Sequence, residues 1–473
     1  MASAGQGAMM RAMPTFPLRS LALVLLTTAA LTAQEPFALV GATVHPGDGS
    51  PPIADAVVVV RDGKIAVVGP RASTKVPDGV RTVDLAGQHV TPGLIDTHVH
   101  YSQTGWADGR PDAANVREQY PYEQAMADNQ AHPERFHRAF LHAGVTAVFD
   151  VGGYPWTLGL QAATTKDPFA PHVLATGPLL ATYDPKLSLP DARQFDFPQD
   201  EAAARAMVQA HKKAGSAAIK FWFVTQADDE VAKWTPVLLA VGAEAKQAGL
   251  PLVVHATTLA SAKVAVEAGA RLLVHSVEDT AVDAAFVAAC KQAGTFYCPT
   301  LTVYAGYAQL YASKLSDEVK AQLDAVHPTV KERALRTEQL PRRNPRVLEA
   351  MAKHLELQGD VMAQNVKALL AAGVPIVLGT DAGNPLTLHG PSVFVEMEAM
   401  AKAGMAPSQV LLASTHDAAR AIGRTDLGRV AVGCVADLVV LPADPTADVR
   451  AFRALTHVVR AGVVHERAAL LPK

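Results

Sequence analysis

Short apolar segments alternate with helical segments along most of this chain, and this alternation limits its fold more than any other feature. Each apolar segment is rich in aliphatic or β-branched residues and is bounded by glycine, proline or alanine-rich sequence, as buried parallel strands are. Strands that alternate with helices predict a parallel sheet. Eight such strands predict closure into a (β/α)8 TIM barrel. We expect the eight strands to end near His100, Val151, Thr176, Phe221, His255, His275, Pro299 and Gly379.

Several of these strands lead to a residue that can bind a metal ion. His98 and His100 are one residue apart, so both side chains point to the same face of their strand. Because the carboxyl ends of barrel strands converge, ligands that follow different strands are expected to form one site. Imidazoles with a carboxylate suit a divalent ion; zinc fits best, with manganese or cobalt as alternatives. The further candidates are Lys220, His255, His275 and Asp381.

These motifs resemble the metal-dependent amidohydrolase superfamily, in its imidazolonepropionase-like and prolidase-like branch. The similarity runs from about Phe37 to the C-terminus and includes Pro92–His100, Gly379–Gly383 and Gly433–Leu441. The resemblance implies two metal ions. It assigns one ion to His98, His100 and Asp381, and the other to His255 and His275. It also implies that Lys220, carboxylated by carbon dioxide to N6-carboxylysine, bridges both ions.

The chemistry of lysine supports that modification independently. A protonated ammonium has no lone pair and repels cations, so unmodified Lys220 cannot be a ligand. As a carbamate, the side chain becomes a bidentate anion that neutralises charge between two cations. The alternative is that Lys220 forms an ion pair with Glu278 or Asp279.

The expected ligands predict a metal-dependent hydrolase. Hydroxide shared by two ions would attack a polarised carbonyl, and Asp381 would move the proton to the leaving group. We therefore expect hydrolysis of a carbon–nitrogen bond in a small molecule such as an N-acyl amino acid or a dipeptide. A mononuclear deaminase or cyclic-imide hydrolase, which would not need Lys220, is an alternative. An esterase, lactonase or phosphotriesterase is another, whereas the complete ligand set argues against a non-catalytic binding protein.

Side chains just beyond strand ends are candidates for substrate binding, since they lie at the catalytic face of a barrel. On this ground we expect Tyr154, Trp156, Tyr304 and His389 to contact substrate. The long helical segment 304–369, between strands seven and eight, falls on the same face. It could act as a lid, form a wall of the pocket or add a purely structural layer.

The remaining histidines and cysteines are expected to be structural. His132, His137 and His142 are five residues apart in a helical stretch, so they spread around the helix and are expected at the surface. An odd number of cysteines argues against a disulfide framework, and all are expected to be buried thiols. They are Cys290, Cys298 and Cys434.

Both ends of the mature chain have the period-two pattern of β-strands. The Asp62-Gly63 pair favours a tight hairpin turn between two of them. In members of the superfamily that this chain resembles, the two ends pair. We therefore expect 36–91 and 424–473 to form a composite β-sandwich beside a barrel at 92–423.

The first residues are typical of an export signal. Arg11 and Arg19 precede the short apolar core Leu21–Leu26, and small residues follow, so 1–33 is expected to be a signal peptide. This predicts a periplasmic or secreted protein without a stable membrane anchor. A net charge of −3 without a basic run gives no basis for binding nucleic acid. A homo-oligomer is compatible with the sequence.

Overall fold

The computed structural model describes residues 35–225 and 228–473, so the expected signal peptide lies outside the described residues. The fold is mixed α/β, with one sheet of eight strands, one of six and one of three. Within the described residues, no helix is both long enough and apolar enough to cross a membrane.

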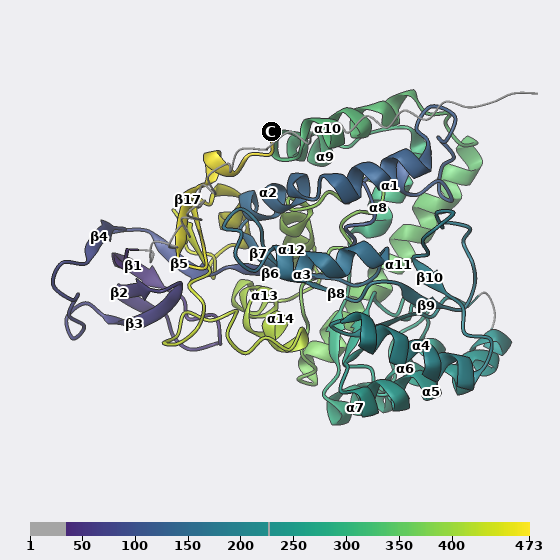
Figure 1. Cartoon of the computed structure of the whole chain (residues 1–473), viewed down its shortest axis with the longest axis horizontal. Helices are drawn as coiled ribbons and strands as arrows, with labels where there is room; N and C mark the ends of the chain where they lie inside the picture. The colour runs from purple at the N-terminus through teal and green to yellow at the C-terminus, as the bar shows by residue number, and fades with distance from the viewer. Residues whose placement is uncertain (1–34, 226–227) are drawn as a thin grey trace, which may run out of the picture. The chain divides into compact units, whose positions relative to one another are not determined.

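The eight-stranded sheet joins the two ends of the chain. Its order is β17-β16-β15-β5-β1-β2-β3, with β4 paired to β1. Figure 1 shows the purple N-terminal strands beside the yellow C-terminal ones, and β5 pairs with β15 antiparallel. The expected pairing of the ends is therefore present, whereas a two-layered sandwich remains a prediction. The strands are β1 (Phe37–Val44), β2 (Ile53–Arg61), β3 (Lys64–Pro70), β4 (Arg81–Asp84), β5 (His89–Pro92), β15 (Leu438–Leu441), β16 (His457–Arg460) and β17 (Val463–Glu466).

Strand β1 changes partner halfway along its length. Its first half, Phe37–Val40, pairs with β4, and its last residues, Thr43 and Val44, pair with β5. The change occurs at Gly41, whose φ of +86° is costly for any residue with a side chain. The irregularity at Gly41 lets the end of β1 pair with β5, which also pairs with β15. β5 is followed directly by β6, the first parallel strand.

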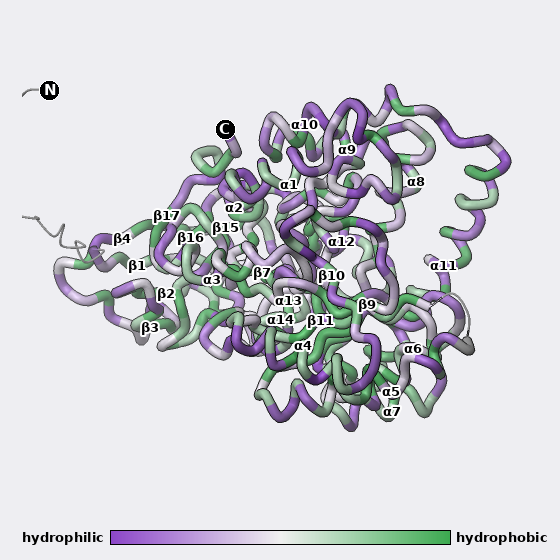
Figure 2. Tube along the Cα trace, turned by 45° about the vertical axis from the view of Figure 1, so that its right-hand side comes forward, coloured by the Kyte–Doolittle hydropathy of each residue, from purple (hydrophilic) through white to green (hydrophobic). Residues whose placement is uncertain are grey.

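The other two sheets consist of parallel strands that are largely buried. Figure 2 shows hydrophobic residues concentrated on the strands near β9 and β11, as expected for buried parallel strands. The three-stranded sheet holds β6 (Leu94–Val99), β7 (Val145–Asp150) and β8 (His172–Ala175). The six-stranded sheet holds β9 (Leu179–Ala181), β10 (Phe195–Asp196), β11 (Ile219–Trp222), β12 (Leu252–His255), β13 (Leu272–Val274) and β14 (Phe296–Cys298).

The expected eighth strand, near Gly379, is not a regular strand. Backbone bonds still join this segment to both neighbours: Val377 N–H donates to Tyr297 of β14 at 2.9 Å, and Thr97 of β6 donates to Leu378 at 3.0 Å. Beyond that point the backbone bonds to a side chain, because Asp96 accepts from the N–H of Thr380 at 3.0 Å and from its hydroxyl at 2.6 Å. A buried carboxylate thus replaces part of a strand ladder.

Helices connect the parallel strands, and their ends follow ordinary capping chemistry. The side chains of Asp200, Thr258 and Asp283 accept N-terminal backbone N–H groups of α4, α6 and α7, which stabilises these helix starts. The helices on this part of the chain are α1 (Tyr122–Ala131), α2 (Glu134–His142), α3 (Leu160–Ala163), α4 (Glu201–Ala214), α5 (Asp228–Ala248), α6 (Leu259–Glu267) and α7 (Ala284–Ala293).

The long segment after β14 is helical, as expected. Its last helix begins at Pro345, capped by the side chain of Asn344, and runs to Ala371. The segment comprises α8 (Val303–Ala312), α9 (Asp317–Gln322), α10 (Pro328–Leu335) and α11 (Pro345–Ala371). The helices α12 (Ser392–Lys402), α13 (Pro407–Ser414) and α14 (His416–Ala421) precede β15.

The surface prediction for three histidines was wrong at two positions. His132 is exposed, but His137 and His142 are buried. Helix α2 is covered on more than one side: the ring of His137 lies 5.5 Å from that of Tyr101, and Arg467 donates to the carbonyl of His142. The cysteines are free and buried, as expected.

Candidate metal centre

A cavity of about 490 Å³ lies at the carboxyl ends of the parallel strands. All the side chains predicted as metal ligands line it, although they come from five separate segments of the chain. The ligand candidates in its wall are His98, His100, Lys220, His255, His275 and Asp381.

His98 on β6 and His100, directly after the end of that strand, both approach Asp381. The carboxylate Oδ1 of Asp381 lies 2.9 Å from Nε2 of His100 and 3.3 Å from Nε2 of His98. One ligand atom from each residue lies within 4.8 Å of the others, close enough to share one ion. Nδ1 of His100 lies 2.7 Å from the carbonyl of Gly152 and can donate to it, which leaves the Nε2 lone pair facing the site.

A second pair of imidazoles lies beside the first group. His255 ends β12 and His275 follows β13, and their ring centroids are 4.3 Å apart. The ring of His275 lies 4.9 Å from that of His98, and its Nε2 lies 3.7 Å from Oδ2 of Asp381. The positions therefore allow a second ion next to the first.

Burial keeps three of these imidazoles neutral. It lowers the pKa of His98 and of His255 well below the usual value, and the pKa of His275 to about 4. A neutral imidazole keeps the lone pair that a metal ligand needs. The site is thus chemically prepared for cations before any cation binds.

Lys220 on β11 is buried without a partner. Its side chain is 1% exposed, and Nζ has no hydrogen-bond partner among the described residues. Burial lowers the pKa of its amine to about 7. Burial of a polar group without a hydrogen-bond partner costs free energy. Such a group is therefore expected mainly where a ligand or a covalent modification supplies the missing partner. This orphaned amine and the neutral imidazoles fit a pair of divalent ions bridged by a carbamate.

The alternative ion pair for Lys220 does not occur within 35–225 and 228–473. Glu278 bonds to Gln358 at 3.2 Å and to Tyr304, and burial raises its pKa to about 8. Asp279 accepts the backbone N–H of Leu259 at 2.9 Å. Both carboxyl groups are therefore engaged elsewhere.

The helical segment after β14 forms a wall of the cavity. Tyr304, predicted as a substrate contact, lines it together with other residues of α8 and α11 at helical spacing. Residues at that spacing lie on one face of a helix, so the spacing could have been used to predict the lining residues from the sequence. They are Val303, Tyr307, Tyr311, Met351, His354, Leu355 and Gln358.

Arg110 and Asn384 are lining residues that sequence reasoning missed. Arg110 donates to Asn384 Oδ1 at 2.6 Å and pairs with Asp112 at 2.8 Å, and Tyr307 donates to the same Asn384 oxygen at 2.5 Å. Arg110 lies in the loop between β6 and α1, where no periodic pattern indicates which way a side chain points. No local signal could have placed its side chain in the cavity.

Three other predicted contacts do not line this cavity. Tyr154 is buried, with its hydroxyl 3.0 Å from that of Tyr122, and Trp156 lines a separate groove. His389 stacks on Phe136 at 3.9 Å, and its Nε2 lies 3.0 Å from the carbonyl of His100. Tyr154 and His389 turn into the packing behind the strand ends, and His389 contacts the backbone of a proposed ligand.

The comparisons with known proteins agree with this geometry. The profile of the Amidohydrolase family matches residues 89–464. An imidazolonepropionase from Salinispora tropica is 27% identical over 403 residues, which cover 82% of this chain and 86% of that protein. The crystal structure of a putative prolidase from Bifidobacterium longum has a TM-score of 0.67 at 25% identity, covering 92% and 95% of the two chains. Molinate hydrolase shares the fold, with a TM-score of 0.67 at 22% identity and coverage of 93% and 96%.

The chain therefore belongs to the amidohydrolase family, in its imidazolonepropionase-like and prolidase-like branch. It is a hydrolase that acts on carbon–nitrogen bonds.

Proposed function

We propose that this protein is a dinuclear metal-dependent amidohydrolase, and that Lys220 as N6-carboxylysine bridges its two ions. The observation that carries the proposal is the buried Lys220 amine, which has no partner among the described residues and shares a cavity wall with four histidines and Asp381. His98, His100 and Asp381 would hold one ion, and His255 and His275 the other. Carbamate formation joins the neutral amine nitrogen to the carbon of carbon dioxide and releases one proton.

Divalent ions, when bound here, supply Lewis acidity toward a carbonyl and make water easier to deprotonate. The protein's own groups do the rest. Asp381 accepts the proton of the attacking water and returns it to the leaving nitrogen. Its position is set by its backbone N–H, which donates to His98 at 2.7 Å, and by a φ of +62°. Asp381 is thus held by β6, which carries His98 and leads directly into His100.

We further propose an N-acyl amino acid or a dipeptide as substrate. Aromatic side chains of the cavity, Trp222, Tyr304 and Tyr307, can pack against an apolar acyl group or side chain. Arg110 lies in the same wall, and a substrate carboxylate could replace Asn384 as the acceptor of one of its charge-assisted hydrogen bonds. Prolidase-like structural relatives agree with a substrate of this size.

The test is metal content per chain, measured by mass spectrometry on protein loaded with zinc and bicarbonate. We expect at least two ions in the wild type and fewer in Lys220→Ala. Lys212→Ala, on an exposed position of α4, is the matched control and should hold as many ions as the wild type. Equal metal content in Lys220→Ala and the wild type would refute the bridge.

A mononuclear deaminase or cyclic-imide hydrolase is the second candidate, favoured by the similarity to imidazolonepropionase. It would use His98, His100, His255 and Asp381 and would not depend on Lys220. One ion per chain at this site in both the wild type and Lys220→Ala would favour it.

Three wider proposals complete this function. The eight parallel segments form a closed TIM barrel, which is supported by bonds from Ala217 to Ala175, from Val377 to Tyr297 and from Thr97 to Leu378. The terminal strands form a β-sandwich domain beside it. Residues 1–33 direct export to the periplasm or medium, supported by the charged start and short apolar core of that segment.

A further inference from the structure

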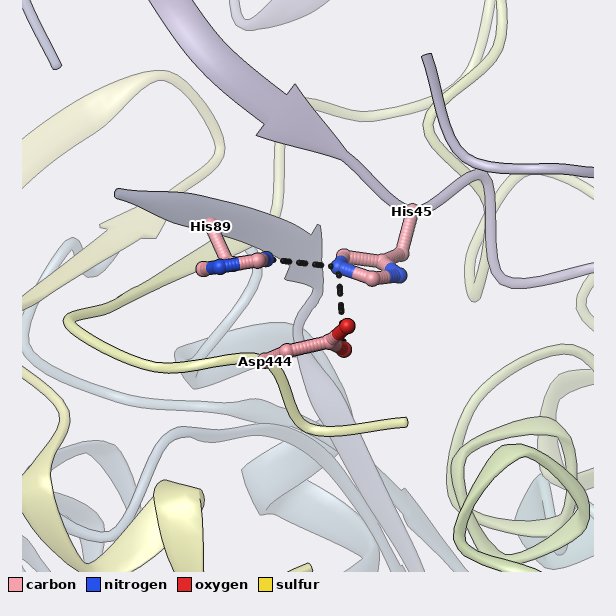
Figure 3. A group of neighbouring side chains, drawn as sticks. All are labelled: His45, His89 and Asp444. Carbon is pink, nitrogen blue, oxygen red and sulfur yellow. Dashed lines mark hydrogen bonds and ion pairs between the residues drawn. The ribbon is translucent and has the colours of Figure 1, made fainter. Parts of the chain in front are cut away.

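A second group of potential ligands lies outside the catalytic cavity, in the sheet that joins the chain ends. His45 directly follows β1, His89 begins β5, and Asp444 lies in the loop after β15. One ligand atom from each of the three residues lies within 4.8 Å of the others. Figure 3 shows one nitrogen of His45, Nε2, directed at the ring of His89. The carboxylate of Asp444 points to the same nitrogen.

Strand register explains why these residues meet. β1 and β5 run parallel with Thr43 opposite His89, so His45, two residues on, lies on the same face as its diagonal neighbour His89. Leu441, the last residue of β15, is also opposite His89, and Asp444 follows it closely. The group is therefore built by three adjacent strands rather than by chance contact of surface side chains.

The distances suit a small divalent ion. His45 Nε2 lies 3.0 Å from His89 Nδ1 and 3.7 Å from Asp444 Oδ1. Tetrahedral zinc with bonds of about 2.0–2.2 Å separates its ligand atoms by roughly 3.3–3.5 Å, so shifts of a few tenths of an ångström would suffice. The ring centroids of the two histidines are 5.3 Å apart.

The surroundings hold the ligands in place. The His45 side chain is only 3% exposed, so the surrounding packing fixes its ring. Asp444 accepts the hydroxyl of Thr446 at 2.6 Å and its backbone N–H at 2.8 Å, which fixes the carboxylate. The Asp444 side chain is 43% exposed, so water can reach a fourth coordination position.

We propose that His45, His89 and Asp444 form a structural site for one divalent transition-metal ion, with zinc as its best match. Two imidazoles and a carboxylate are a ligand set that zinc binds. The ion would join strands from both ends of the chain, because β1 and β5 belong to the N-terminal part and Asp444 to the C-terminal part. In its absence the two imidazoles share a hydrogen bond, and Nδ1 of His45 has no partner among the described residues.

The test is zinc content per chain in His89→Gln, measured on full-length protein loaded with zinc and then desalted. Glutamine can keep a hydrogen bond to His45 but is a poor zinc ligand. His457→Gln on the neighbouring strand β16 is the matched control. Each substitution is made in the wild type and in Lys220→Ala, so that changes at the catalytic cavity are counted separately.

We expect His89→Gln to lose one ion per chain in both backgrounds, and His457→Gln to lose none. Unchanged zinc content in folded His89→Gln would overturn the proposal and leave a plain hydrogen bond between two histidines. Asp444→Asn gives an independent test, because its partly exposed side chain can be changed without disturbing the core. It should weaken zinc retention on dialysis at least tenfold, and retention equal to that of the wild type would also overturn the proposal.

Discussion

Two buried cations in this molecule have opposite surroundings. Arg460 on β16 is 1% exposed; it donates to the carbonyl of Ala170 at 2.8 Å and of Thr164 at 3.1 Å, and lies 4.0 Å from Asp437. Lys220 is equally buried, yet its amine has no partner in the described part of the chain. The guanidinium joins the terminal sheet to the segment before β8, while the amine faces a cavity.

The difference separates structural from functional polar residues. A buried charge stabilises a fold only where hydrogen bonds and counter-charges replace the lost water, as they do around Arg460. Lys220 has no hydrogen-bond partner among the described residues, and the negative charge of Asp381 offsets only part of the cost of burial, so its position costs stability in the metal-free chain. Such a cost is typical of sites whose missing partner is a ligand or a modification.

The largest effect is expected at the cavity, for Asp381→Asn. Loss of the group that moves the proton should lower kcat about 10³-fold, while circular dichroism remains that of the wild type. The assay is hydrolysis of the N-acyl amino acid or dipeptide that the wild type cleaves fastest. The exposed Asp191→Asn is the control. A loss of less than tenfold would show that Asp381 does not carry the proton.

Arg460→Met should produce the next largest effect, on stability rather than turnover. It leaves two buried carbonyls without their donor and removes the cation near Asp437, so the free energy of unfolding should fall by about 3 kcal/mol. Urea denaturation measures it. Arg450→Met, at an exposed pair with Asp448, should leave the midpoint nearly unchanged. If both variants lose the same free energy of unfolding, burial does not explain the contribution of Arg460 to stability.

Lys220→Met should stabilise the metal-free protein, whereas Arg460→Met destabilises it. At neutral pH and below, replacing an unpartnered buried cation should raise the free energy of unfolding by about 1–4 kcal/mol. The advantage should shrink as pH rises from about 7 towards 10.5, because folded Lys220 is then neutral whereas unfolded lysine still binds its proton. Wild-type stability thus rises with pH in this window.

Urea denaturation of chelated protein at several pH values tests this, with Lys212→Met as the control. Lower stability of Lys220→Met at every pH would mean that the amine has a stabilising partner after all.

The parts of the site that follow strand ends could be predicted from sequence. A strand fixes the direction of its side chains, so His98, His100 and Lys220 could be assigned to one face and one end. Loop residues such as Arg110 have no such rule, and their direction depends on contacts made only in the folded chain. The eighth strand was predicted as regular because its apolar pattern does not reveal that the Asp96 side chain bonds to the backbone there.

Helices posed a different difficulty. Spacing predicts how residues spread around a helix, but not how many sides of that helix are covered. For α2, contacts with Tyr101 on one side and Arg467 on another bury His137 and His142.

The pairing of β5 with β15 has a consequence for how the chain folds. During synthesis, the edge of β5 that bonds to Leu438–Leu441 stays open until nearly the whole chain has emerged. Contacts between such distant segments slow folding, and an open strand edge can pair with other chains. The nascent N-terminal strands are therefore open to pairing with other chains, and a C-terminal truncation that removes β15 would make that temporary exposure permanent.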